Sequence, residues 1–275
     1  MANFTIADIK ALREQLGTGM VDTKNALEEA DGDVEKAVEI LRLKGAKGNA
    51  KRADRSTSEG IVTAHQEGGQ VTMIELACET DFVAKTDRFI ALADKVLAAA
   101  AESAATSVDE ALSATSDGQS VQQVISDEAA IIGEKVELRR VATLNGDHVQ
   151  VYLHKTNKDL PPQVGVALVY SGDDVETARS LAQHISFANP SFLSRDQVPE
   201  QDVEREREIV TEISRGEGKP EAALPKIVEG RVNAFFKQVV LLDQDYARDN
   251  KQSVKQVADA AGLTLNGFAR FKVGA

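Results

Sequence analysis

At Cys78-Glu79-Thr80-Asp81-Phe82-Val83-Ala84-Lys85, an apolar strand-like run gives way to a helical pattern. The apolar run covers residues 71–77, and the helical pattern begins near Asp87. A junction of this kind exposes side chains and free backbone N–H groups, so it is a common place for recognition. The alternative interpretation is structural: Thr80 caps the turn and Phe82 packs inward. The rest of the chain is arranged on either side of this junction.

The residues around the junction predict a small sheet covered by helices. Residues 60–65 and 71–78 alternate in polarity and flank a Gly-containing turn, which is a hairpin signal. A long helix with an apolar stripe follows the junction, and a second helix covers about 121–132. Residues 102–120 are low in complexity and contain a loop, whereas 135–141 alternate as a further strand.

The same order of elements returns in the second half of the chain. Residues 148–154 and 164–170 predict two strands around a turn, and a helix over about 175–188 follows. An alternating strand over 265–273 closes the second sheet. Both halves run strand, turn, strand, junction, helix, which indicates an internal duplication. The predicted fold class is α+β, with two related subdomains that each hold a small antiparallel sheet.

Residues from about 5 to 43 predict three short helices, a module of the size of a recognition domain. Gly17-Thr18-Gly19 separates the first two helices. The next residue, Met20, either belongs to a tight interhelical turn or gives an exposed contact loop a flexible apolar tip. Residues 44–58 are basic and predict either a flexible linker or a basic helix end. A solvated linker is favoured there over an RNA contact.

An insertion in the second half predicts an antiparallel helical hairpin, a short coiled coil that projects from the body. Its two helical patterns cover 202–214 and about 221–242, and a Gly-rich turn joins them. Pro225 either lies in the first turn of the second helix or kinks it. The expected division of the chain is a three-helix module with the basic stretch at 1–55, a first subdomain at 56–144, and a second at 145–275 with the hairpin at about 200–243.

Composition and charge exclude several classes of protein. The formal net charge of −12 repels nucleic-acid phosphates, so we expect no direct nucleic-acid partner. No run approaches the ~18 apolar residues of a membrane span, so no membrane segment is visible. Residues 1–4 contain no basic residues followed by an apolar segment, so no secretory signal is visible either. The single cysteine, Cys78, excludes an internal disulfide and a multi-cysteine metal site. The composition and charge best fit a cytoplasmic protein that binds another protein.

The chain offers little for catalysis, so we expect no enzymatic activity, no cofactor and no metal site. No Gly-Lys-Ser/Thr phosphate loop is present, and the four histidines are scattered without a metal-ligand pair at helical spacing. Cys78 could serve as a nucleophile with a distant histidine, but a cysteine at the end of an apolar strand is more often a core residue. Carboxylates are too abundant for one acid–base pair to be singled out.

Two segments resemble the bacterial elongation factor Ts family. Residues 12–27, which read Leu-Arg-Glu-Gln-Leu-Gly-Thr-Gly-Met-Val-Asp-Thr-Lys-Asn-Ala-Leu, are similar to its amino-terminal signature. They depart from it at Val21 and Thr23, where Met and Cys are usual. Residues 75–85 are a near-complete match to the family's most specific motif, in which Ala77 replaces a frequent Asn. Further matches, which spread the resemblance over essentially the whole chain, lie at 218–220, 228–231 and 267–271.

The resemblance implies a translation elongation factor that acts as a guanine-nucleotide exchange factor for the GTPase elongation factor Tu. It also implies an N-terminal three-helix module of ubiquitin-associated type, a core of two related α+β subdomains and the helical hairpin. In the family, the Asp-Phe loop disturbs the partner's Mg²⁺ and phosphate site, while the module and a later histidine make further contacts. By position these partner-binding residues are Thr80, Asp81, Phe82 and Val83 for the loop, Met20 and Val21 for the module, and His154.

The sequence is compatible with more than one oligomeric state and more than one function. The oligomeric state can be a homodimer or a 1:1 heterodimer with the GTPase. The family often continues into a carboxy-terminal helix that grips the GTPase, and this sequence ends at Ala275, so we expect that contact to be missing or replaced. An alternative function is a non-catalytic adaptor or chaperone of a GTPase. A remote one is an acyl-transfer enzyme that uses Cys78.

Overall fold

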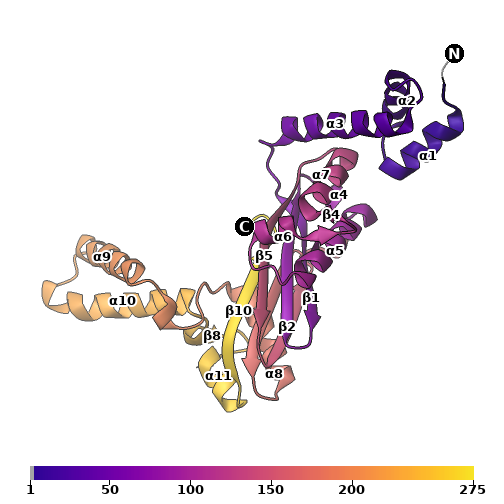
Figure 1. The fold of residues 1–275 in the computed structure, drawn as a ribbon. Coiled ribbons are helices and arrows are strands. Elements are labelled where there is room, and N and C mark those ends of the chain that lie inside the picture. Colours follow the sequence, from indigo (N-terminus) through magenta and orange to yellow (C-terminus); the bar gives the residue numbers. More distant parts are fainter. Residues whose placement is uncertain (1–2) are drawn as a thin grey trace.

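The structure, a computed structural model, describes residues 3–275 as an elongated α+β molecule. Figure 1 shows three parts in a row: the N-terminal helices at one end, a central body of strands and covering helices, and a helical hairpin that projects from the body at the other end. The predicted fold class, with N-terminal helices, small antiparallel sheets and an inserted hairpin, is confirmed. Met1 and Ala2, which the predicted module includes, lie outside the described residues.

The N-terminal part consists of α1 (Ile6–Leu16), α2 (Met20–Glu29) and α3 (Val34–Arg52). Thr5 and Asp8 cap α1 reciprocally: the Thr5 hydroxyl accepts from Asp8 N at 3.3 Å, and the Asp8 carboxylate accepts from Thr5 N at 2.7 Å. Gly17 ends α1 at φ 65°, a conformation that L side chains rarely adopt. The three helices bury one small apolar cluster, made of Ile9, Leu12, Ala26, Leu27, Ala30, Ala37 and Leu41.

Helix α3 is long because the basic stretch continues it through residues 44–52. The basic helix end is therefore the correct alternative for these residues, and the flexible linker is wrong. Tertiary packing stabilises the extension: α3 lies along α7 (Val121–Ile132), and the Asn49 side-chain amide donates to the Ser126 carbonyl at 2.8 Å. Gly45 permits the close approach, since a Cβ atom there would lie 2.8 Å from a side-chain carbon of α7.

The first sheet has the order β1-β2-β5 and is antiparallel throughout. Its strands are β1 (Glu59–Glu67), β2 (Gln70–Cys78) and β5 (Val136–Asn145). Helices α5 (Asp87–Glu102) and α6 (Val108–Ser113), together with α7, cover one face of this sheet and bury a large apolar cluster. The low-complexity stretch holds α6 and a small hairpin of β3 (Thr115–Ser116) and β4 (Gln119–Ser120).

The second sheet is also antiparallel, with the order β10-β7-β6. Its strands are β6 (His148–His154), β7 (Val164–Ser171) and β10 (Thr264–Lys272). Helix α8 (Val175–Ala188) covers β6 and β7, and α11 (Val254–Ala260) adds to the same apolar cluster. A short hairpin precedes α11 and consists of β8 (Asp245–Tyr246) and β9 (Asp249–Ser253).

The two sheets pack against each other through their remaining faces. Val62 and Met73 of the first sheet share one apolar cluster with Val169 and Phe271 of the second. Gly165 allows the close approach, because a Cβ atom at this position would lie 2.4 Å from the Val62 side chain. The body is therefore layered as helices, sheet, sheet and helices.

The inserted hairpin pairs α9 (Glu200–Gly216) with α10 (Leu224–Val239), which run antiparallel. Pro225 lies in the first turn of α10, where its missing N–H leaves no hydrogen bond unmade. Val210, Val228 and Val232 form a small cluster of the hairpin's own. Short 3₁₀ helices flank the hairpin helices, and they are Arg195–Gln197, Glu221–Ala223 and Leu241–Asp243.

Candidate partner-binding site

The junction singled out in the sequence is a four-residue helix, α4 (Asp81–Ala84), between β2 and α5. Thr80 caps α4: its hydroxyl accepts from Val83 N at 3.4 Å, and its carbonyl accepts from Ala84 N at 3.1 Å. Thr86 caps α5 in the same way, with a bond of 3.2 Å from the backbone to its hydroxyl. Two successive caps keep α4 from merging into α5, so the chain turns sharply at the end of the sheet.

Phe82 is the exposed side chain of this turn, with 71% of its surface open to solvent. The structural alternative, in which Phe82 packs inward, is wrong because α4 turns another face to the core. Ala84 is fully buried, and Val83 packs against the first core cluster. The Lys85 Nζ lies 4.5 Å from the centroid of the Phe82 ring and 3.7 Å from the Asp81 carboxylate. The turn therefore presents an apolar ring beside a carboxylate.

Cys78 ends β2 inside the core, directly before the turn. It is fully buried, and its Sγ donates to the Thr80 carbonyl at 3.3 Å. Burial raises the pKa of the Cys78 thiol to about 12, and the negative charges of Glu134 and Glu59 add to the rise. A thiol that stays protonated and shielded from solvent is no nucleophile at neutral pH, so the acyl-transfer alternative has no support at this residue.

Two glutamates hold the turn in place: Glu79, which lies in the motif at 75–85, and Glu134, which no sequence pattern marks. Glu134, in the loop between α7 and β5, accepts hydrogen bonds from the backbone of Glu79 and Thr80. Glu79 in turn accepts from Lys135 N at 2.6 Å and pairs with Arg55 at 3.2 Å. Burial alone would raise the pKa of the Glu79 carboxyl, but these two partners lower it. Glu134 lies 54 residues from Thr80 in an acid-rich chain, so only the fold identifies it.

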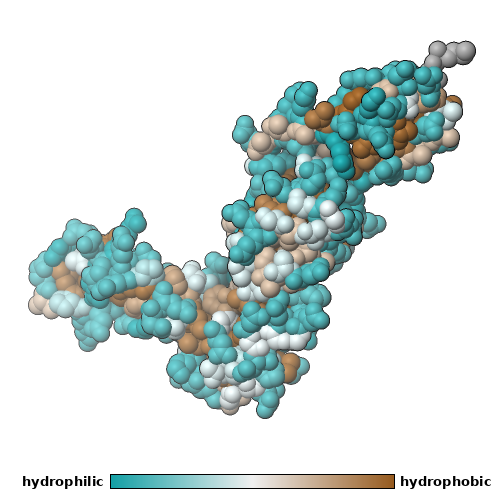
Figure 2. Space-filling view, in the orientation of Figure 1, coloured by the Kyte–Doolittle hydropathy of each residue, from teal (hydrophilic) through white to brown (hydrophobic). Residues whose placement is uncertain are grey.

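Met20 and Val21 are the first two residues of α2, and they are 51% and 70% exposed. Figure 2 shows apolar residues gathered over the N-terminal helices to which they belong. The turn before them lies beside α5, since a Cβ atom at Gly17 would lie 2.7 Å from the Arg88 guanidinium. Arg88 is the second residue of α5, which begins directly after the Phe82 turn, so its side chain spans from the Phe82 side of α5 to the α1–α2 turn.

His154 ends β6 at the same end of the packed sheets as the turn. It is exposed, and its Nδ1 lies 3.1 Å from the Tyr152 hydroxyl. A chain of contacts links it to the turn: the His154 carbonyl accepts from Gln163 N at 3.0 Å, and the Gln163 side chain donates to Glu59 at 3.3 Å. Glu59 then pairs with Cys78 across β1 and β2. Contact of His154 with a partner stays a prediction.

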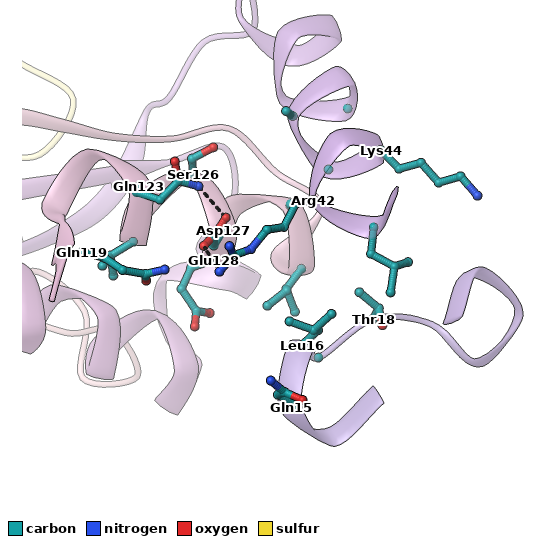
Figure 3. A pocket seen from close by; sticks show the side chains of 18 of the residues that line it. Gln15, Leu16, Thr18, Arg42, Lys44, Gln119, Gln123, Ser126, Asp127 and Glu128 are labelled. Carbon is teal, nitrogen blue, oxygen red and sulfur yellow. Dashed lines mark hydrogen bonds and ion pairs between the residues drawn. The ribbon is translucent and has the colours of Figure 1, made fainter. Parts of the chain in front are cut away.

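A cavity of about 630 Å³ lies between the N-terminal helices and α7, and no residue of the Phe82 turn lines it (Figure 3). Arg42 of α3 reaches toward Asp127 of α7, with 3.9 Å between their charged groups, whereas Lys44 points outward. The lining mixes acidic, basic and apolar side chains.

Within residues 3–275, no group of three or more His, Cys, Asp or Glu side chains could hold a metal ion. No helix in this described range is long and apolar enough to cross a membrane.

These features define a class of protein: an α+β protein of two packed antiparallel sheets that offers an exposed aromatic turn at one end of them. The family model described as Elongation factor TS matches residues 79–275. The proteins named elongation factor Ts from Leifsonia xyli subsp. xyli and Clavibacter michiganensis subsp. michiganensis are 70% and 69% identical to the chain. That of Kocuria rhizophila is 53% identical, and all three matches cover 100% of both chains. The chain belongs to the elongation factor Ts family of translation elongation factors.

Proposed function

We propose that this protein is a guanine-nucleotide exchange factor that binds the GDP form of elongation factor Tu and promotes GDP release, so that GTP can bind. It acts by binding and converts no substrate chemically. The observation that carries the proposal is Phe82, a large apolar ring exposed on a doubly capped turn. This turn belongs to residues 75–85, the motif of the chain most specific to the family.

The mechanism follows from the way a GTPase holds its nucleotide. Backbone amides cradle the phosphates of GDP, and a bridging Mg²⁺ tolerates little distortion of its octahedral shell. Phe82 is the wedge that displaces helices or side chains of the partner beside that shell, because a rigid apolar ring is the kind of group that anchors an interface. Asp81 contacts polar groups at the ends of the partner's helices. Thr80 and Val83 hold the wedge from below by capping and by packing.

Exchange then obeys thermodynamic linkage. If binding of the factor weakens the affinity of the partner for GDP by some ratio, GDP weakens the affinity for the factor by the same ratio. The complex of factor, partner and GDP is therefore transient, and the nucleotide-free complex of two proteins is tight. GTP binding releases the factor by the same linkage.

Further contacts are proposed on both sides of the turn. Met20 and Val21 supply an exposed apolar contact from the N-terminal helices, and His154 supplies one from the second sheet. All three side chains are exposed, which supports their place in the proposed contact surface. The Gly17–Arg88 and Gln163–Glu59 contacts, which link their segments toward the turn, support it as well. The proposed oligomeric state is either a homodimer or a 1:1 heterodimer with elongation factor Tu. We propose the cytoplasm, where translation takes place, as its location, with no direct nucleic-acid partner.

The test is truncation of the wedge, Phe82→Ala. Stopped-flow release of a fluorescent GDP analogue from elongation factor Tu, measured at saturating factor, gives the rate. We expect release to slow about thirtyfold, the equivalent of the ~2 kcal/mol typical of a truncated interface hot spot. The free protein should keep its stability, since the Phe82 ring is solvent-exposed and its removal opens no cavity.

The matched control is Val175→Ala, which truncates another exposed apolar residue at the start of α8. The strand before it, β7, runs away from the His154 end of the sheet, so Val175 lies far from the turn. This variant should release GDP at the wild-type rate. An unchanged rate with Phe82→Ala refutes the wedge. Tight binding without any acceleration by the wild-type protein supports the alternative, a non-catalytic adaptor or chaperone.

A further inference from the structure

We infer that Glu134 is a positioning residue of this site: its carboxylate holds the turn at residues 80–83 in the conformation that presents Phe82. The inference rests on the proposed function, because it concerns how the contact surface of that function is held. Glu134 itself lies in the α7–β5 loop and acts on the turn through hydrogen bonds.

Glu134 makes three hydrogen bonds to the start of the turn. Its Oε2 accepts from Glu79 N at 3.1 Å and from Thr80 N at 3.0 Å, and its Oε1 accepts from the Thr80 hydroxyl at 2.6 Å. Hydrogen bonds to a carboxylate are shorter and stronger than bonds between neutral groups. One side chain therefore satisfies the two backbone donors that precede α4 and fixes the direction of the Thr80 hydroxyl.

The direction of that hydroxyl decides whether α4 is capped. When Thr80 donates its proton to Glu134, the oxygen lone pairs are free to accept from Val83 N, the capping bond of 3.4 Å. A helix of four residues is not stable through its own hydrogen bonds, since the first turn orders several residues for very few hydrogen bonds. Without Glu134, Thr80 is free to rotate, and Phe82 loses its fixed direction.

The hydrogen bonds between residues 79–80 and residues 134–135 run in both directions, and they tie the turn to the end of the first sheet. Lys135, the residue after Glu134, donates its backbone N–H to the Glu79 carboxylate at 2.6 Å. Each of the two segments thus satisfies the backbone of the other. Both leave paired strands at the same place, because the pairing of β2 and β5 continues past a bulge at Glu75–Leu76 to Cys78 and Val136. Glu134 therefore transmits the rigidity of the first sheet to an exposed turn.

The test compares Glu134→Ala with Glu134→Gln and a matched control, Glu110→Ala. The Glu110 carboxylate also accepts from the backbone N–H and the hydroxyl of one threonine, Thr106, at 2.7 and 2.8 Å, but it does so from the first turn of α6. Its removal has a similar local effect away from the turn. A glutamine at 134 can still accept from the two backbone donors through its amide oxygen. Its amide N–H then donates to the Thr80 hydroxyl oxygen, whose second lone pair still accepts from Val83 N, so this variant should rescue the turn.

Two measurements on the full-length chain decide the inference. With Glu134→Ala, amide protons of residues 79–83 should exchange with solvent faster, and the apparent second-order rate constant of GDP release from elongation factor Tu should fall about tenfold. Glu134→Gln should stay within about threefold of the wild type. Glu110→Ala should lose stability and keep the wild-type rate constant. If Glu134→Ala does not fold, Glu134→Asp, which keeps the charge on a shorter side chain, should change both readings in the same direction.

Unchanged amide exchange at residues 79–83 overturns the inference, and so does an unchanged rate constant when that exchange is faster. An equal loss of rate in Glu110→Ala also overturns it, since the effect is then one of stability alone. If the wild-type protein itself does not accelerate GDP release, the proposed function fails instead. The positioning role of Glu134 is in that case decided by the amide exchange.

Discussion

At the residue scale, neighbouring side chains in the turn have opposite roles. Cys78 and Val83 face the core, and the Thr80 hydroxyl caps the short helix. Asp81 and Phe82 point into solvent, where Lys85 contacts both. This division explains how a strongly structural motif can also present a contact surface: the buried half of the turn fixes the direction of the exposed half.

Buried His184 of α8 carries a residue-scale prediction about pH. Its Nδ1 accepts from Ala247 N at 3.2 Å, so its Nε2 carries the proton and donates to the Gln244 side-chain oxygen at 2.9 Å. Burial lowers the pKa of His184 from its ordinary value of 6.5, against the opposite effect of the Gln244 hydrogen bond. Protonation of Nδ1 would remove the acceptor of the Ala247 N–H.

We expect the free energy of unfolding to fall as the pH drops below 6.5. Above that value neither state binds the proton. Below it, the unfolded chain takes up a proton that the folded chain resists, so unfolding is favoured until the lowered pKa of the folded state is reached. One such group changes the free energy by at most about 1.4 kcal/mol per pH unit.

Urea unfolding at several pH values from about 7.5 to 5.5, the range in which histidines titrate, measures this effect. His184→Gln should remove its part of the pH dependence. His65→Gln, at an exposed position of β1, should leave the dependence as it is. A pH dependence that survives His184→Gln in full contradicts the assignment.

At the scale of elements, α3 illustrates how packing decides the length of a helix. Its basic half contains Gly45 and Gly48, and each glycine disfavours an isolated helix by roughly 1 kcal/mol relative to alanine. Docking along α7, with the bond from Asn49 to the Ser126 carbonyl, offsets that disadvantage. The same residues read in isolation are equally compatible with a linker.

The two glycines allow a matched experiment, Gly45→Ala against Gly48→Ala. Both changes improve helix propensity. A Cβ atom at Gly48 would meet only the movable Arg52 guanidinium at 3.4 Å, so we expect a gain of roughly 0.5–1 kcal/mol in the free energy of unfolding. At Gly45 the Cβ atom would lie 2.8 Å from the Ala130 Cβ, so that gain should be lost and the α7 amides should exchange faster. Equal gains at both positions, read by chemical denaturation, would contradict the packing of α3 on α7.

At the scale of the whole molecule, the two sheets form one packed unit and the hairpin forms another. The sheets share the cluster that includes Met73 and Phe271, whereas the hairpin buries its own valines. The hairpin joins the body through a narrow base, where Ser191 N donates to the Val239 carbonyl and Leu241 N to the Phe192 carbonyl, both at 2.8 Å. Figure 1 shows the hairpin extending away from the body beyond this base.

Replacement of residues 200–238 by a short Gly/Ser linker should therefore leave the body folded. We expect its thermal midpoint to move by less than about 4 °C, which corresponds to about 1 kcal/mol for a chain of this size. Circular dichroism gives the midpoint, and amide exchange of β7 reports on the second sheet. A collapse of β7 protection would mean that the hairpin stabilises the body, contrary to the separate clusters.

Much of the fold could be predicted because its signals are local. The helix expected over 121–132 has those same bounds, since Ser120 caps its start and Gly133 ends it at φ 82°. The strands and the hairpin of α9 and α10 follow in the same way from alternation and helical spacing. The boundaries of the two subdomains, and the partner contacts of Phe82, Met20 and His154, stay predictions.

The sequence by itself determined the elements, their order and the motif at 75–85, because caps, turns and periodicity act between residues only a few positions apart. The tertiary structure alone decided that Phe82 faces solvent and that α3 continues through its basic half. It also decided that Glu134 accepts hydrogen bonds from the start of the turn. Each of these depends on which distant segment packs beside the residue, and a contact across 54 residues leaves no local pattern. The turn that organises the chain is thus encoded locally and oriented by the rest of the fold.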